Sequence, residues 1–118
     1  GYEIGRLLKT RTIFAERVDG TLQLRRGFKI PEKSNVLIVE DVITTGKSAL
    51  ECSKLIASNK ANLVGYACII DRSDSKVLIK DKILSQIKIS IKTYDEKSLP
   101  EELKQIPSSS PGSKKISK

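Results

Sequence analysis

Residues 36–48, which read VLIVEDVITTGKS, bring an apolar run, two acids and a hydroxyl-rich turn together in one short stretch. Ionised carboxylates accept several hydrogen bonds at once, so Glu40 and Asp41 suit the paired hydroxyls of a ribose. The turn at residues 44–48 offers hydroxyl donors, and Gly46 lets another group approach its backbone closely. We expect this order of residues to form a site for a sugar phosphate.

The elements on either side of these residues would position them. The apolar run at residues 36–39 is short enough to be a strand that is buried on both faces of a parallel sheet. In open α/β sheets, ligands collect just outside the carboxyl ends of the strands, where the two acids stand. After the turn, apolar residues recur at roughly helical spacing, so the turn should open a helix whose free backbone N–H groups hold a phosphate. These apolar positions are Ala49, Leu50, Cys52, Leu55 and Ile56.

This stretch has three other interpretations. The letters GKS suggest an ATP-binding P-loop, but that motif requires a glycine at the position of Asp41. A phosphoacceptor receiver domain would also carry an acidic pair after a first strand. Here the pair likewise follows a strand-like region, but a hydroxyl-rich loop comes next. Finally, the stretch could be an ordinary strand end whose Thr or Ser residues cap the next helix. Caps and anion sites use the same groups, so the motif alone leaves this last interpretation open.

Three further segments extend the pattern: IFAERVDGTLQLRRGF at residues 13–28, ACIIDRSD at residues 67–74 and PGSK at residues 111–114. With them, residues 36–48 resemble the phosphoribosyl pyrophosphate (PRPP) signature of type I phosphoribosyltransferases, and in particular of the bacterial orotate phosphoribosyltransferases. Together the segments cover most of the chain. The signature alone indicates the superfamily, whereas the preference for orotate depends on the less specific flanking segments.

The resemblance implies a role for each matching residue. The two acids would hold the ribose hydroxyls of PRPP, and the turn would wrap its 5′-phosphate. Thr44 and Arg72 would contact orotate, and a planar guanidinium suits the carboxylate of that base. Without the family, Arg72 could equally be a surface arginine beside Asp71 and Asp74, because exposed ion pairs are common and weak. The implied PRPP-binding residues are Arg17, Glu40, Asp41, Val42, Ile43, Thr44, Thr45, Gly46, Lys47 and Ser48.

Residues 14–28 read as two short strands joined around Asp19 and Gly20, which form a hairpin turn signal. In the family, this region is a mobile loop that folds over the active site and supplies cations to the leaving pyrophosphate. Some members use a lysine and a histidine there, but this chain has no histidine. The resemblance therefore implies that Arg25 and Arg26 are the catalytic residues of a mobile hairpin. Alternatively, they only decorate an exposed hairpin of a basic chain.

The resemblance also implies a reaction. A ring nitrogen of orotate would displace pyrophosphate from the anomeric carbon of PRPP and give orotidine 5′-phosphate, a step of UMP biosynthesis. The implied cofactor is Mg²⁺, which binds largely through substrate phosphates, so no protein metal ligand is expected. Members of the family usually work as homodimers in which the mobile loop reaches the neighbouring site, and the resemblance implies a homodimer for this chain. Two alternatives stay open: a phosphoribosyltransferase for a purine or other base, and a non-catalytic regulator that senses PRPP.

The composition fits one domain: 118 residues, 38% of them hydrophobic and 31% charged. The resemblance implies that this domain is α/β, with a mostly parallel sheet flanked by helices. We expect a phosphoribosyltransferase core at residues 1–106 and an irregular basic tail at 107–118, with irregular chain already from Leu99, because proline and serine accumulate there. Residues 2–9 match the helix that follows the family's pyrophosphate-binding loop. The resemblance therefore implies the carboxyl-terminal part of such an enzyme, without that loop and without the amino-terminal hood strands.

Three further elements are expected from hydrophobic periodicity: a buried strand at residues 63–70, a short helix at 77–83 and a half-exposed strand at 87–91. Cys52 in the expected helix and Cys68 in the expected strand have neither metal-ligand nor secretory disulfide spacing. We therefore expect both to be small buried apolar residues.

The net charge of +8 would by itself suggest a polyanion such as nucleic acid as a partner. However, the three tyrosines and two phenylalanines are spread along the chain, whereas single-strand binders rely on aromatic stacking. We expect no nucleic-acid partner and a positive field that attracts PRPP and orotate. No apolar run approaches the ~20 residues that span a bilayer, and no signal peptide is recognisable, so we expect no membrane partner and a cytoplasmic protein.

Overall fold

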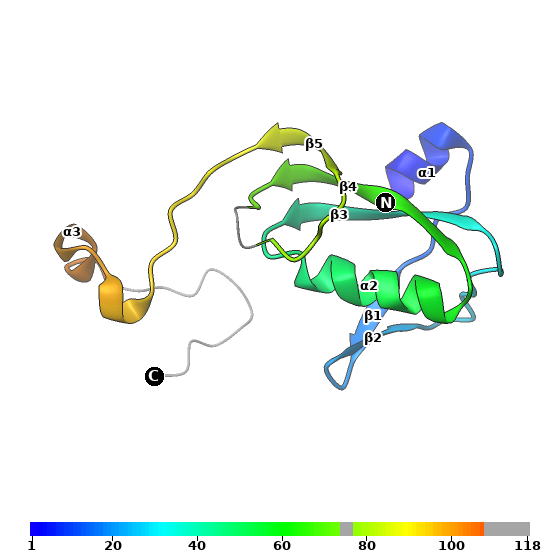
Figure 1. Cartoon of the computed structure of the whole chain (residues 1–118), viewed down its shortest axis with the longest axis horizontal. Coiled ribbons are helices and arrows are strands. Elements are labelled where there is room, and N and C mark those ends of the chain that lie inside the picture. The colour runs from blue at the N-terminus through cyan, green and yellow to red at the C-terminus, as the bar shows by residue number, and fades with distance from the viewer. Residues whose placement is uncertain (74–76, 108–118) are drawn as a thin grey trace.

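The computed structural model describes residues 1–73 and 77–107. The chain forms a three-stranded sheet and a two-stranded hairpin. Figure 1 shows a helix below the larger sheet and the hairpin against that helix. In chain order the elements are α1 (Tyr2–Leu8), β1 (Ala15–Val18), β2 (Thr21–Leu24), β3 (Asn35–Ile43), α2 (Lys47–Ser58), β4 (Asn62–Asp71), β5 (Ile83–Lys88), the 3₁₀ turn η1 (Glu96–Ser98) and α3 (Glu101–Lys104).

The central sheet is parallel and has the strand order β3-β4-β5. Helix α2 connects β3 to β4, as a crossover between parallel strands requires. In this register Ile38 lies opposite Tyr66, and Tyr66 lies opposite Ile83. The expected α/β architecture, with a parallel sheet and flanking helices, is confirmed.

Helix α2 covers one face of the sheet and makes the core with it. Its buried residues, Ala49 and Ile56, are seven positions apart and therefore lie on one helical face. Leu24 of the hairpin packs against the same core. The expectation that the turn opens a helix is confirmed, because α2 begins directly after Gly46. The buried hydrophobic residues are Ile30, Ile38, Ile43, Ala49, Ile56, Tyr66, Cys68 and Ile79.

The opposite face of the sheet is largely open, so the expectation that residues 36–39 are buried on both faces is wrong. Register and strand alternation put Leu37, Ile69 and Leu84 on this face, and their side chains are 38%, 56% and 58% exposed. Helix α1 lies only near one end of the face, where Ile4 lines a cleft of about 410 Å³ together with Leu37. Within the described residues, the middle of this face has no covering layer.

The hairpin is confirmed as predicted. Strands β1 and β2 pair antiparallel, with Ala15 opposite Leu24, and Asp19 and Gly20 form the turn with φ angles of 46° and 82°. Positive φ at both central residues is the geometry that hairpin turns favour. The two cysteines are free, with Cys52 half-buried in α2 and Cys68 buried in β4.

The short helix expected at residues 77–83 is wrong. The N–H of Leu78 donates to the carbonyl of Thr45 at 2.9 Å, and the side chain of Ile79 is buried in the core. Ile83 already pairs with Tyr66 as the first residue of β5. Contacts with the rest of the fold therefore override the local helical spacing.

The boundaries of the last expected strand, at residues 87–91, are also wrong. Strand β5 begins at Ile83 and ends at Lys88, where its partner strand β4 ends at Asp71. Beyond it, residues 89–107 form a C-terminal arm that extends away from the sheet (Figure 1). The radius of gyration is 17.1 Å, compared with about 13–14 Å for a compact chain of this length, which is consistent with an extended arm.

Irregular chain was expected from Leu99 onward, but helix α3 forms at Glu101–Lys104. That part of the expectation is wrong. Apart from Pro107, the expected tail at 107–118 lies outside the described residues, as does the PGSK segment.

Candidate functional site

The two acids lie inside β3, which continues beyond Asp41 to Ile43. Side chains of successive strand residues point to opposite faces, so the two carboxylates are on different sides of the sheet edge. Glu40 pairs with Cys68 on the face that α2 covers. Asp41 is exposed, and its Oδ1 accepts the N–H of Val42 at 2.8 Å. A ligand at this strand end could therefore contact the carboxylates from two sides.

Glu40 faces a cleft of about 760 Å³ between the hairpin, β3 and α2. Arg17, Ser48 and Cys52 line the same cleft. Partial burial raises the pKa of Glu40 above its ordinary value, and the charge of neighbouring Asp41 raises it further. A carboxylate in this position is under-solvated, so hydroxyl donors of a ligand would compensate it.

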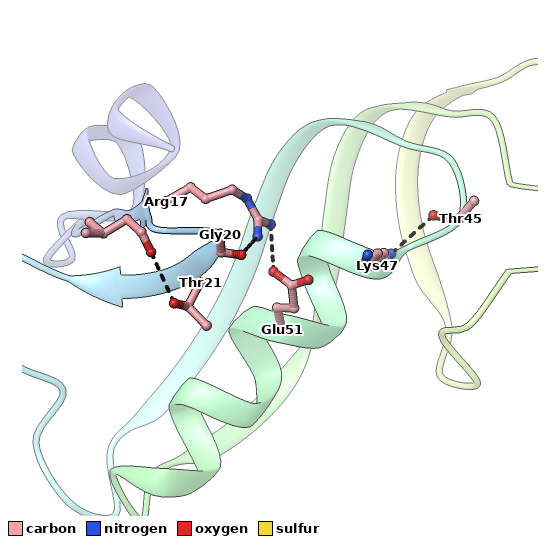
Figure 2. A network of polar contacts seen from close by, with 7 residues as sticks. Arg17, Gly20, Thr21, Thr45, Lys47 and Glu51 are labelled. Atoms are coloured by element: carbon pink, nitrogen blue, oxygen red, sulfur yellow. Dashed lines mark hydrogen bonds and ion pairs between the residues drawn. The ribbon is translucent and has the colours of Figure 1, made fainter. Parts of the chain in front are cut away.

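The turn after β3 is exposed except at Gly46 and ends in the first turn of α2. The Leu50 N–H donates to the Gly46 carbonyl at 2.9 Å, which starts the helical hydrogen bonding. The Lys47 N–H donates to Thr45 Oγ1 at 3.4 Å, a contact visible at the start of α2 in Figure 2. The positive end of the α2 dipole therefore faces a small, hydroxyl-bearing turn, as anion sites require.

Gly46 has a positive φ of 76° and leaves no room for a side chain. A Cβ there would lie 2.8 Å from Cγ1 of Ile79. The carbonyl of Thr45 also accepts the N–H of Leu78 at 2.9 Å. The segment that follows β4 thus fixes the shape of the turn.

Arg72 lies next to this turn, although it directly follows the neighbouring strand, β4. Its backbone N–H donates to the carbonyl of Ile43 at 2.8 Å, at the last residue of β3, and its side chain is exposed. The structure therefore brings the arginine implied for the base to the same sheet edge as residues 40–48.

Arg17 of the hairpin reaches α2. Its Nη2 lies 2.6 Å from Oε2 of Glu51, and its Nη1 donates to the carbonyl of Gly20, as Figure 2 shows. Glu51 is one turn after Lys47 on α2. Arg17 therefore lies beside the first turns of α2 and close to the predicted phosphate turn.

Arg25 and Arg26 share one carboxylate at the base of the hairpin. Arg26 Nε lies 2.7 Å from Oε1 of Glu16, and Arg25 Nη1 lies 3.6 Å from Oε2. The Arg26 guanidinium carbon is also 5.5 Å from the centre of the Phe14 ring. Among the described residues that line the Glu40 cleft, Arg17 is present, whereas Arg25 and Arg26 are not.

Three acidic partners were not singled out from the sequence: Glu16, Glu51 and Asp71. The first two hold the hairpin arginines, and Asp71 is the buried residue directly before Arg72. A buried position for Asp71 had a sequence signal, because it ends an apolar strand. The partners of Glu16 and Glu51 had none, because the pairing depends on tertiary structure.

Residues 1–73 and 77–107 contain no group of three or more His, Cys, Asp or Glu side chains that could hold a metal ion. Glu40 and Asp41 remain as hard oxygen donors at the strand end. Such donors fit a Mg²⁺ ion that arrives mainly bound to a diphosphate. In the part of the chain that the structure describes, every helix is too short or too polar to cross a bilayer.

Comparison with known proteins gives consistent results. Residues 6–105 match the model of the phosphoribosyl transferase domain. The chain is 43% identical over 115 residues to an orotate phosphoribosyltransferase from Thermoanaerobacter sp. (strain X514), covering 98% of the chain and 60% of that relative. It is 44% identical over 115 residues to an orotate phosphoribosyltransferase from Caldicellulosiruptor saccharolyticus, with the same coverage. The chain thus spans about 60% of the length of the curated relatives it matches.

Among solved structures, the fold is similar to that of adenine phosphoribosyltransferase from Leishmania donovani, with a TM-score of 0.53 and 19% sequence identity. The match covers 86% of this chain and 53% of that one. At this identity the likeness concerns the fold alone. The domain match, the identities and the strand–turn–helix at residues 35–58 together lead to one conclusion: the chain belongs to the phosphoribosyltransferase domain family.

Proposed function

We propose that this chain carries the PRPP site and the base-recognition arginine of an enzyme that transfers a phosphoribosyl group from PRPP to orotate. The products would be orotidine 5′-phosphate and pyrophosphate, in pyrimidine biosynthesis. The observation that supports this most directly is the 2.8 Å hydrogen bond from the Arg72 N–H to the Ile43 carbonyl, because it brings Arg72, whose guanidinium suits a carboxylate, beside the acidic strand end and its turn. The names of the curated relatives support the same reaction.

On the PRPP side, we assign the 5′-phosphate to the turn at residues 44–48, where the first N–H groups of α2 and the hydroxyls of Thr44, Thr45 and Ser48 can donate to it. Glu40 and Asp41 would accept the ribose hydroxyls. Thr44 would also contact the base, while Val42, Ile43 and Lys47 contribute backbone to the site. The protein needs no nucleophile, because holding the anomeric carbon and the ring nitrogen in line provides much of the rate enhancement.

The leaving pyrophosphate would be stabilised by Arg17, Arg25 and Arg26. Each is bound to a carboxylate in this structure: Arg17 to Glu51, and the other two to Glu16. We infer that these arginines exchange their carboxylate partners for pyrophosphate oxygens when the hairpin at residues 14–28 moves over the site. Positive charge placed where negative charge develops lowers the barrier.

Mg²⁺ would be held by substrate oxygens, with Glu40 or Asp41 as the nearest protein donors. It would neutralise charge on the diphosphate. We also propose a cytoplasmic homodimer in which the hairpin of one protomer reaches the site of the other, with PRPP and orotate as the ligands.

Two other functions make different predictions. A phosphoribosyltransferase for a purine would not need Arg72, whereas a PRPP-sensing regulator would bind PRPP without turnover. Orotidine 5′-phosphate and UMP distinguish an orotate enzyme from a purine enzyme, because these two nucleotides differ only in the base carboxylate. We expect Arg72→Ala to lower affinity for orotidine 5′-phosphate about 10- to 100-fold and to leave affinity for UMP nearly unchanged.

The PRPP site itself is tested by calorimetric titration of the chain with PRPP and Mg²⁺. The double variant Asp41→Asn, Thr45→Val removes one charge and one hydroxyl from the site. The matched control, Asp95→Asn, Thr93→Val, makes the same chemical changes at exposed positions of the C-terminal arm. We expect the site variant to abolish measurable binding and the control to bind as the unmodified chain does.

Equal binding by both variants would contradict the assignment of residues 36–48 as the PRPP site. Absence of binding by a folded, unmodified chain would show that these residues do not hold PRPP without the further length present in the relatives. Circular dichroism of each variant establishes that it is folded.

A further inference from the structure

Asp71 is the one charged residue that is buried in the described part of the chain, with 4% of its surface exposed. Burying a carboxylate costs several kcal/mol, in order of magnitude, unless hydrogen bonds and opposite charge compensate it. Its position at the end of β4 therefore calls for a reason. Asp71 also directly precedes Arg72, to which we assign the base carboxylate.

The compensation comes from the residues that follow. The Asp71 Oδ1 accepts the backbone N–H of Ser73 at 2.8 Å, and Oδ2 lies 3.7 Å from Nζ of Lys88 on β5. Burial alone would raise the pKa of Asp71, but hydrogen bonds from Ser73 and the charge of Lys88 outweigh it and hold the pKa below its ordinary value. The carboxylate is therefore ionised at neutral pH.

The hydrogen bond from the Ser73 N–H to the Asp71 side chain closes a small turn around Arg72. An aspartate that bonds the backbone two residues ahead forms such a turn independently of the sheet. On the other side, the Arg72 N–H is bound to the Ile43 carbonyl at 2.8 Å. The Arg72 backbone is thus fixed on both sides while its guanidinium stays exposed.

We propose that Asp71 is a positioning residue for Arg72: its buried carboxylate fixes the turn at residues 71–73 and thereby directs the guanidinium to the carboxylate of the base. The inference rests on the proposed orotate site. Because the backbone is already held before binding, less of the binding free energy is lost in ordering the long side chain. A carboxylate that only ended β4 would affect stability and would not distinguish one base from another.

A double-mutant cycle with two ligands tests this. The variants are Asp71→Ala, Arg72→Ala and the combination, each titrated calorimetrically with orotidine 5′-phosphate and with UMP. We expect Asp71→Ala to lower affinity for orotidine 5′-phosphate about three- to tenfold, as the loss of one positioning hydrogen bond would, and to leave UMP unchanged. In the Arg72→Ala background, the same change should have no further effect. Asp71→Asn keeps an oxygen that accepts the Ser73 N–H, so it should bind orotidine 5′-phosphate nearly as the unmodified chain does.

If circular dichroism shows that Asp71→Ala is unfolded, Asp71→Leu gives the same information. It removes both carboxylate oxygens and fills a similar volume with apolar atoms, a change that buried charged positions often tolerate, and the same selective loss is expected. Three outcomes would overturn the role of Asp71. These are an equal loss of affinity for both ligands, no loss of affinity, and a further loss in the Arg72→Ala background. Equal affinity of the unmodified chain for the two ligands, or no effect of Arg72→Ala, would instead overturn the proposed orotate site.

Discussion

Glu40 is the residue at which stability and ligand binding make opposite demands. Partial burial and the charge of Asp41 raise its pKa in the folded chain. Between the unfolded pKa, about 4.3, and the raised folded value, the folded state binds more protons than the unfolded state. Stability therefore falls as pH rises through this window, and at neutral pH the ionised Glu40 destabilises the fold.

We expect Glu40→Gln to stabilise the chain at pH 7 by a few tenths of a kcal/mol, because water still screens this half-buried side chain. The gain should disappear below about pH 4, where both states carry a protonated carboxyl group. Urea denaturation across this pH range measures it, with the exposed Glu102→Gln on α3 as the control. A gain that did not depend on pH would contradict the argument. The same variant should bind PRPP more weakly.

Gly46 and Gly27 form a natural pair for measuring how tightly the turn at residues 44–48 is held. Both have a positive φ, 76° and 72°, but a Cβ at Gly46 meets Ile79 at 2.8 Å, whereas a Cβ at Gly27 meets nothing within 4 Å. Alanine at either position pays for the backbone strain, about 1 kcal/mol. We expect Gly46→Ala to lower the free energy of unfolding by about 1–3 kcal/mol more than Gly27→Ala. Equal losses in urea denaturation would mean that Ile79 moves aside freely.

At the scale of elements, the hairpin holds two of its arginines, Arg25 and Arg26, in ion pairs with its own acid, Glu16. Glu16 contacts both Arg25 and Arg26, whose side chains are 58% and 67% exposed. If these arginines bind pyrophosphate, Glu16 competes with it. We expect Glu16→Gln to raise the affinity for pyrophosphate with Mg²⁺ about two- to fivefold, since exposed pairs are worth about 0.2–1 kcal/mol.

Calorimetry measures this affinity. The matched control is Glu32→Gln, which also releases a cation, Lys60, from an exposed ion pair. That pair lies outside the hairpin. Unchanged or weaker binding in Glu16→Gln would argue that Arg25 and Arg26 do not contact the leaving group.

The sequence predicted the elements whose cause is local. The turn chemistry of Asp19 and Gly20 predicted the hairpin, and the apolar spacing after Gly46 predicted α2. Residues 77–83 were predicted wrongly, because their structure depends on distant partners such as Thr45 and Tyr66. The partners of the site arginines could not be predicted for the same reason. The ion pair between Arg17 and Glu51 joins residues far apart in the chain, so the spacing of residues in the sequence does not predict it.

At the scale of the whole molecule, the open face of the sheet is the dominant feature. Parallel sheets are normally covered on both faces, yet Leu37, Ile69 and Leu84 are exposed opposite α2. Exposed apolar surface of this kind favours association. We expect the chain to self-associate at micromolar concentration and Ile69→Lys, Leu84→Glu to shift it toward monomer, as measured by sedimentation velocity.

The matched control for that experiment is Ile106→Lys, Leu103→Glu, which makes the same changes at exposed apolar positions of the C-terminal arm. If the control shifts the chain toward monomer and the sheet-face variant does not, the arm and not the sheet face drives association. A monomeric unmodified chain would show that the exposed face is tolerated in water.

The hydrogen bond between Arg72 and Ile43 joins two segments to which we assign different parts of the substrate. The groups assigned to the sugar phosphate come from β3 and its turn, whereas the group assigned to the base comes from the end of β4. If these assignments hold, residues 71–73 can be exchanged to change the accepted base while the residues assigned to the sugar phosphate stay untouched.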